Sequence, residues 1–139
     1  MAKPATVEVT PFHFGVSVPD IEASVKWYEE MFGFTEAKRM EMAGRGKIVF
    51  VRRGDFYIEF FQMEGAKTLP DDRRYPNKDL MTHGWKHLSF VVKDAHKAAE
   101  ALKKRGVEVV MEGGQGAQAM AFIRDNAGNL IELNQVGAP

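Results

Sequence analysis

The stretch YIEFFQ, residues 57–62, has the apolar and aromatic composition of a buried strand but carries a carboxylate, Glu59, in its middle. Near the C-terminus the stretch LIELNQ, residues 130–135, repeats this pattern around Glu132, at an offset of 132 − 59 = 73 residues. A buried carboxylate costs several kcal/mol unless it is paired, protonated or bound to a cation. Its recurrence in a second strand therefore indicates an internal repeat with a chemical purpose.

A second pair of matching segments lies upstream of these strands. Residues 13–20 (HFGVSVPD) align with residues 87–94 (HLSFVVKD) at an offset of 87 − 13 = 74, and both begin with His and end with Asp. Each Asp is followed by apolar residues at helical spacing, over 21–32 and 95–105. Residues suited to helix N-caps and to left-handed helix ends flank both segments: Asp20, Asp94, Gly33 and Gly106.

Three strands joined by short turns are expected after each helix. The short turns favour antiparallel hairpins over the parallel doubly wound sheet that two βαβ-like units would otherwise suggest. We therefore expect an α+β fold of two tandem βαβββ modules in a single domain, 1–139, with module one at 11–63, a polar linker or lid at 64–83 and module two at 84–136. The expected strands are 35–42, 47–52, 56–62, 107–111, 119–124 and 130–135.

Each copy offers one His from its first strand and one Glu from its last. Side chains alternate between the faces of a strand, so these two share a face if the last strand pairs beside the first. Taken singly, a strand His is more often a hydrogen-bonded core residue, and a strand Glu more often points into solvent. The repetition favours a metal site, because two imidazoles and two carboxylates suit Zn, Ni, Co, Mn or Fe(II). The predicted ligands of one divalent ion per site are His13, Glu59, His87 and Glu132.

The overall composition excludes several classes of function. Lys+Arg 19 balance Asp+Glu 19, whereas nucleic-acid binding needs an excess of basic charge. The absence of cysteine excludes disulfides, thiolate catalysis and Cys-based zinc sites. No apolar run is long enough to span a bilayer, and the N-terminal segment lacks the apolar core of a signal peptide. We expect a cytoplasmic protein that acts on a small molecule.

Three stretches resemble the vicinal oxygen chelate superfamily of glyoxalases, bleomycin-resistance proteins and extradiol dioxygenases. Two are HFGVSVPDIEASVKWYEEMFGF (13–34) and HLSFVVKD (87–94). The third, DNAGNLIEL (125–133), is similar to the family's Asp-Pro-x-Gly-Asn-x-Ile-Glu-Leu signature. The resemblance covers about residues 12–136. It implies paired βαβββ modules forming a curved mixed sheet around a metal cup, the four ligands named above, and a homodimer; in some members two chains build the metal site.

The ligand pattern is most similar to that of lactoylglutathione lyase (glyoxalase I), which has a carboxylate at the position of Glu59. The resemblance implies isomerase, epimerase or lyase chemistry, in which Glu132 or Glu59 moves a proton beside the carbonyl of a 2-oxo or 2-hydroxy acyl compound chelated through vicinal oxygens. The alternative enzyme is an extradiol Fe(II) dioxygenase, which would leave Glu59 unliganded. The non-catalytic alternative is a small-molecule-binding protein of the bleomycin-resistance kind, and a structural role for the metal also stays open.

The substrate pocket is expected to be aromatic rather than charged. In glyoxalase I a basic residue four positions after the first His and an Asn four positions after the first Glu help to hold glutathione. The corresponding residues here are Ser17 and Met63, so glutathione is disfavoured as the substrate. The predicted substrate-binding set combines this serine with two aromatic residues that alternation places beside Glu59 and one at the end of the linker. Its members are Ser17, Tyr57, Phe61 and Trp85.

Overall fold

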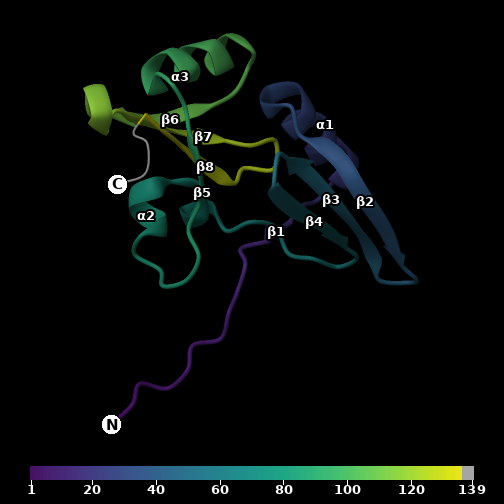
Figure 1. The fold of residues 1–139 in the computed structure, drawn as a ribbon. Coiled ribbons are helices and arrows are strands. Elements are labelled where there is room, and N and C mark those ends of the chain that lie inside the picture. The colour runs from purple at the N-terminus through teal and green to yellow at the C-terminus, as the bar shows by residue number, and fades with distance from the viewer. Residues whose placement is uncertain (136–139) are drawn as a thin grey trace.

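The structure, a computed structural model, describes residues 1–135, and each half of the chain forms a βαβββ module (Figure 1). Module one consists of β1 (His13–Ser17), α1 (Ile21–Phe32), β2 (Thr35–Met42), β3 (Gly46–Arg53) and β4 (Phe56–Met63). Module two consists of β5 (Leu88–Val91), α3 (Ala95–Lys104), β6 (Val109–Gly113), η2 (Gly116–Gln118), β7 (Met120–Arg124) and β8 (Leu130–Asn134). The linker between them contains η1 (Asp71–Arg74) and α2 (Pro76–Asp79).

Each module forms its own four-stranded mixed sheet, in the order β1-β4-β3-β2 or β5-β8-β7-β6. The first and last strands of a module pair in parallel, and the remaining neighbours are antiparallel. The predicted α+β class is therefore confirmed. The pairing of last strand beside first strand, on which the shared His–Glu face depended, is also confirmed.

Both helices begin and end with the residues that the repeat indicated. The carboxylates of Asp20 and Asp94 accept hydrogen bonds from backbone N–H groups in the first turns of α1 and α3. The first N–H of each helix donates to the glutamine that ends the repeat, Ile21 N to Gln62 Oε1 at 2.8 Å and Ala95 N to Gln135 Oε1 at 3.0 Å. This accounts for the recurrence of that glutamine, because N-terminal helix N–H groups need partners outside the helix.

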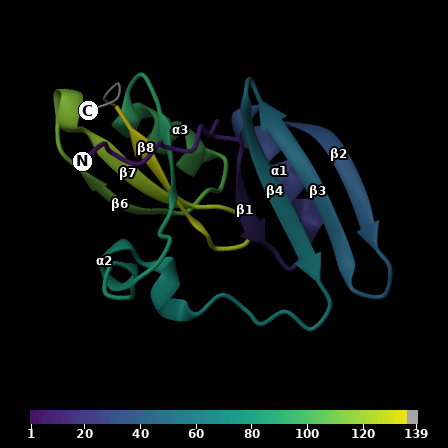
Figure 2. The same cartoon turned by 60° about the horizontal axis from the view of Figure 1, so that its bottom comes forward.

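The two modules share one apolar core, which lies between each sheet and its helix and continues across the junction. In β4, Ile58 and Phe60 are fully buried in this core, as are Ile131 and Leu133 in β8. Alternation then directs Glu59 and Glu132 to the opposite face of each sheet. Figure 2 shows the two sheets side by side, with the linker and α2 below them.

The structure shifts several predicted element ends by one or two residues. The largest shift is at β6, which begins at Val109 rather than 107, because Val107 packs into the core just after the turn that ends α3. His87 directly precedes β5 instead of opening it. Residue 136, where module two was expected to end, lies outside the described residues. No helix within residues 1–135 has the length and apolar character needed to cross a membrane.

Candidate functional site

The first candidate pair lies on the outer face of the module one sheet. His13 Nε2 is 2.8 Å from Glu59 Oε2, with side chains 28% and 15% exposed. Gly15 is the cross-strand neighbour of Glu59 in β1. A Cβ at position 15 would approach the Phe61 ring to 3.3 Å, so glycine leaves room for the side chains that pack around the carboxylate.

The second pair occupies the equivalent place in module two. His87 Nε2 is 3.3 Å from Glu132 Oε2, with side chains 24% and 18% exposed. Ser89 replaces the glycine as the cross-strand neighbour of the glutamate. Glu132 has one further contact, because Asn134 Nδ2 donates a hydrogen bond to its Oε1 at 3.3 Å.

An aromatic ring packs edge-on against the imidazole in each pair. Phe50 lies opposite Glu59 in the β3–β4 hairpin, and its ring centroid is 5.3 Å from that of His13 at an interplanar angle of 89°. Phe122 lies opposite Glu132 and is 4.8 Å from the His87 ring at 87°. Neither ring was predicted to pack against an imidazole. The sequence does carry a signal for this role, because the offset between the two phenylalanines, 122 − 50 = 72 residues, is close to the offsets of the His and Glu residues.

The structure brings three of the four predicted substrate-binding residues to the face of the first pair. Tyr57 and Phe61 flank Glu59 at i ± 2 in β4, and Ser17 lies four residues after His13 in β1. Trp85 lies elsewhere. Its side chain is 84% exposed and its ring contacts Phe14, which alternation places on the other face of β1 from His13.

Within one chain the four predicted ligands form two separate pairs. Among residues 1–135, no three His, Cys, Asp or Glu side chains come close enough together to hold a metal ion. Each pair is a half-site that supplies one imidazole nitrogen and one carboxylate, donors that suit a borderline divalent cation. A cavity of about 710 Å³ opens at the junction between the modules, but none of the four ligands lines it.

The family-like stretch DNAGN, residues 125–129, has a structural role at the junction. Asp125 is 5% exposed and its Oδ1 accepts hydrogen bonds from the N–H groups of Ala127 and Asn129 at 2.9 Å. Its Oδ2 accepts a 2.9 Å hydrogen bond from the hydroxyl of Tyr28 in α1. Burial raises the pKa of the Asp125 carboxyl, opposed by these hydrogen bonds, and burial likewise raises the pKa of the Tyr28 hydroxyl. This loop ties module two to the helix of module one.

Comparison with known proteins links the sequence to one superfamily. A family model described as the Glyoxalase/Bleomycin resistance protein/Dioxygenase superfamily matches residues 10–133. A lactoylglutathione lyase of Neisseria meningitidis is 29% identical over 127 residues, which cover 88% of each chain. A probable lactoylglutathione lyase of Synechocystis sp. is 24% identical over 130 residues, covering 91% of this chain and 95% of the relative.

Solved structures of low identity share the fold. A glyoxalase family protein from Bacillus cereus aligns with a TM-score of 0.75 at 21% identity, covering 98% of this chain and all (100%) of that one. The trypanothione-dependent glyoxalase I of Leishmania major aligns with a TM-score of 0.73 at 21% identity, covering 92% and 87%. A fosfomycin resistance protein from Mesorhizobium loti aligns with a TM-score of 0.66 at 18% identity, covering 95% and 94%. The same architecture therefore carries different activities.

Proposed function

Because the chain belongs to the glyoxalase/bleomycin resistance protein/dioxygenase superfamily, we propose that it is a metal-dependent enzyme of the glyoxalase I type. The reaction moves a proton beside the carbonyl of a 2-oxo or 2-hydroxy acyl compound bound through vicinal oxygens. The observation that carries the proposal is the His13–Glu59 contact at 2.8 Å, with its counterpart His87–Glu132 at 3.3 Å on the equivalent face of the second sheet. The names of the relatives, lactoylglutathione lyases, support the same activity.

The complete site is shared between two chains. A single chain offers only two-donor half-sites, since no larger group of potential ligands forms among its described residues. A twofold dimer that places the module one face of one chain against the module two face of its partner unites all four donors, and does so twice. Exposed apolar side chains near both half-sites support a protein-covered face, since Phe12 is 57% exposed and Val91 65%.

The four ligands have distinct tasks in this site. His13 and His87 supply neutral nitrogen donors, and the rings of Phe50 and Phe122 hold their imidazoles in place. The metal, when bound, acts as a Lewis acid that stabilises negative charge on the substrate oxygens. A carboxylate takes the proton from the carbon beside the carbonyl and returns it to the same or the neighbouring carbon.

Glu59 is the better placed of the two glutamates to act as this base. Glu132 is restrained by Asn134 as well as by His87. For Glu59, the only polar side-chain contact recorded within residues 1–135 is the one to His13. A carboxylate with fewer restraints is freer to rotate between ligand and base positions. A role for Glu59 also separates this proposal from the dioxygenase alternative, which uses only the other three ligands.

The substrate is a thiol adduct or a thioester, and its binding does not require glutathione as the thiol. Ser17 presents an uncharged hydroxyl on the face of His13, and Met63 ends β4 with an apolar side chain. Neither residue offers the charge or amide that would hold the carboxylates of glutathione. Tyr57 and Phe61 add an aromatic wall around Glu59, which suits an apolar acyl group.

Complementation between two inactive chains tests the shared site. One chain carries His13→Ala and Glu59→Ala, and the other His87→Ala and Glu132→Ala. After loading with Zn or Ni, neither chain alone is expected to hold metal or to convert the adducts of a 2-oxoaldehyde with glutathione or coenzyme A. Refolded together, they are expected to recover about one quarter of the wild-type metal content, because half the dimers are mixed and each mixed dimer has one intact site.

A matched double variant, His83→Ala with Glu64→Ala, removes the same residue types away from the two pairs and should retain the full metal content. Wild-type protein that holds no metal under any loading condition would overturn the proposed enzyme. Metal binding by the wild type without recovery in the mixed dimers would instead confine the site to one chain and overturn only its shared construction.

A further inference from the structure

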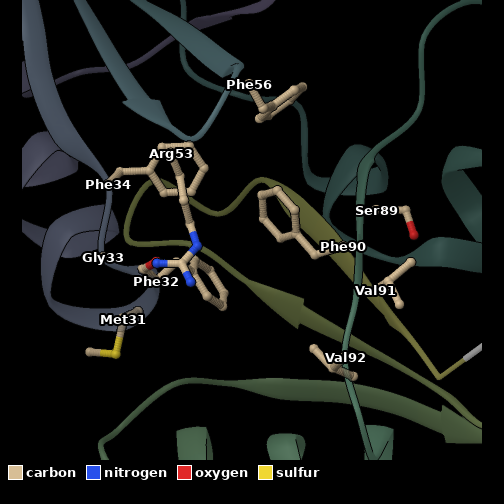
Figure 3. Close-up of a pocket in the computed structure, with 10 residues that line it drawn as sticks. All are labelled: Met31, Phe32, Gly33, Phe34, Arg53, Phe56, Ser89, Phe90, Val91 and Val92. Atoms are coloured by element: carbon tan, nitrogen blue, oxygen red, sulfur yellow. The ribbon is translucent and has the colours of Figure 1, made fainter. Parts of the chain in front are cut away.

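None of the four predicted ligands lines the cavity between the modules, although Ser89, the cross-strand neighbour of Glu132, is one of its lining residues. Its walls come from the end of α1 (31–34), the β3–β4 turn with Arg53 and Phe56, and residues 89–92 in and after β5 (Figure 3). Its volume of about 710 Å³ is within the range of sites that enclose small organic molecules. All of its lining residues belong to one chain, and one of them, Val91, also lies on the face that the proposed dimer covers.

Aromatic contacts between the two modules form the wall of this cavity. Phe90 of β5 lies at the centre, with ring centroids 5.3 Å from Phe32, 6.0 Å from Phe34 and 6.2 Å from Phe56. Rings in mutual tilted and edge-to-face contact are held in place by their neighbours. The apolar wall is therefore already formed before any ligand arrives.

Of the described residues that line the cavity, Arg53 alone is charged. Its Nη1 donates a 3.0 Å hydrogen bond to the carbonyl oxygen of Phe32 at the end of α1, and Figure 3 shows the guanidinium beside the Phe32 ring. A Cβ at position 33 would lie 2.8 Å from this nitrogen, so Gly33 both ends the helix and makes room for the cation. Within the described part of the chain, Arg53 takes part in no ion pair, and one hydrogen bond leaves most of its five N–H donors free.

The equivalent junction on the other side of the molecule is covered by the chain itself. There the end of β1 meets the loop before β8, around a cavity of about 370 Å³. Linker residues 65–69 form one wall of that smaller cavity. Among residues 1–135, no linker residue lines the larger cavity.

We infer that the larger cavity binds an organic monocarboxylate with an apolar body, whose carboxylate pairs with Arg53 and whose body packs against Phe90. Guanidinium groups bind carboxylates through paired hydrogen bonds, and an anchored guanidinium loses little freedom on doing so. The aromatic wall supplies burial for the apolar body but no second charge. A neutral ligand of the same length therefore leaves the cation unpaired and binds more weakly.

Octanoate is the probe, and 1-octanol is its uncharged counterpart. In a titration of the full chain followed by two-dimensional amide NMR, octanoate is expected to shift the signals of Phe34, Phe56, Phe90 and Val92. Arg53→Gln is expected to raise the Kd for octanoate about tenfold, the effect of losing one charge-assisted contact. The neighbouring variant Arg52→Gln makes the same change of charge outside the cavity and should leave the Kd within about twofold.

Arg53→Lys keeps the charge but not the paired hydrogen bonds, and it serves as a second variant in case Arg53→Gln unfolds, which a thermal melt shows. It should raise the Kd for octanoate by less than Arg53→Gln does. Equal Kd values for Arg53→Gln and Arg52→Gln, or for octanoate and 1-octanol, would overturn the inference. So would shifts confined to the faces of the His–Glu pairs. The signals of the four amides could instead shift with the concentration of the protein and not with that of octanoate. That result would assign the cavity to a second copy of the chain and would also overturn the inference.

Discussion

Module one and module two share their strand order, helix caps and His–Glu pairs, but they differ in how each is anchored to its surroundings. Module one continues into a linker held by a buried carboxylate, Asp79, which contacts Arg73 at 2.8 Å and Lys86 at 3.3 Å. Module two is anchored through Asp125, which reaches Tyr28 of module one. The residues that recur belong to the half-sites and the helix starts, whereas the residues found once hold the modules and the linker together.

The half-sites themselves also differ, in a way that bears on their chemistry. The His–Glu distance is 2.8 Å in module one and 3.3 Å in module two, where Asn134 holds the glutamate from its other oxygen. Module one has Phe61 at the equivalent position beside Glu59. The difference indicates one glutamate that serves mainly as a ligand and one that is free to move.

The largest expected effect tests whether Glu132 serves mainly as a ligand and Glu59 as the base. Glu59→Gln should lower kcat by about 10²–10⁴-fold, because an amide accepts no proton, while the other three ligands retain most of the metal. Glu132→Gln should instead lower the metal content, measured by elemental analysis, because it removes the charge of the glutamate that serves mainly as a ligand. Glu64→Gln, just beyond β4, is the matched control and should change neither quantity. Equal loss of metal in Glu59→Gln and Glu132→Gln would remove the distinction between the modules.

The next effect concerns the linker, which has no counterpart among the described residues after β8. Asp79→Ala should lower the free energy of unfolding by about 2–3 kcal/mol, because it leaves two cations without their shared carboxylate. The loss is moderated by the remaining hydrogen bonds of Lys86 Nζ to backbone carbonyl oxygens of α2 and the following turn. Urea denaturation measures it. Asp72→Ala, an exposed carboxylate in η1, should cost much less, and equal losses for the two variants would contradict a special role for Asp79.

A smaller and symmetrical effect is expected at the two helix starts. Gln62→Ala and Gln135→Ala each remove the side-chain acceptor of the first helix N–H, so each should lower the free energy of unfolding by about 1 kcal/mol. Gln118→Ala, an exposed glutamine in η2, provides the control in the same denaturation experiment. A loss of unfolding free energy in only one of the two variants would show that the two glutamines do not stabilise their helices equally.

The smallest effect concerns the protonation of His96 in module two, where the described part of module one has no His at the equivalent position, residue 22. His96 Nδ1 lies 2.9 Å from Glu112 Oε1, and Nε2 lies 3.0 Å from the Gly114 carbonyl oxygen. The Glu112 hydrogen bond and then the Gly114 carbonyl raise the pKa of His96, since two acceptors favour the doubly protonated ring. A raised folded-state pKa adds stability below the unfolded pKa, and this contribution is lost as the pH rises through the folded value.

An NMR pH titration of the His96 ring checks this sign. Glu112→Gln should lower the pKa of His96, because it removes the strongest of the two acceptors. Glu100→Gln, which changes an exposed carboxylate of α3 that pairs with Lys104, should leave the titration of His96 unchanged. An unaltered His96 titration in Glu112→Gln would show that the contact does not persist in solution.

Most of the fold could be predicted because its signals are local and occur twice. The aspartate caps, the glycines after the helices and the alternation around Glu59 each depend on a few adjacent residues. The His–Glu pairing within a module followed from one assumption, that the last strand lies beside the first, and the structure confirms that pairing. The composition of a complete four-ligand site stays a prediction.

Other features depend on contacts between segments that have no periodic relation in the sequence. The position of Trp85 beside Phe14 depends on the path of the linker. The polar composition of the linker gives no indication of that path. The aromatic cavity requires α1, the β3–β4 turn and β5 to meet at the junction, and none of these segments identifies the others as neighbours.

By itself the sequence determined the two βαβββ units, their caps and the presence of one imidazole and one carboxylate on a common face of each, because strand alternation and helix capping act over a few residues. Only the tertiary structure decided that the two half-sites of a chain stay apart, that Asp125 joins the modules through Tyr28, and that Arg53 lies at an aromatic cavity. The reason is that the packing of one module against the other is set by the shape of the whole apolar core, which no short stretch of sequence encodes.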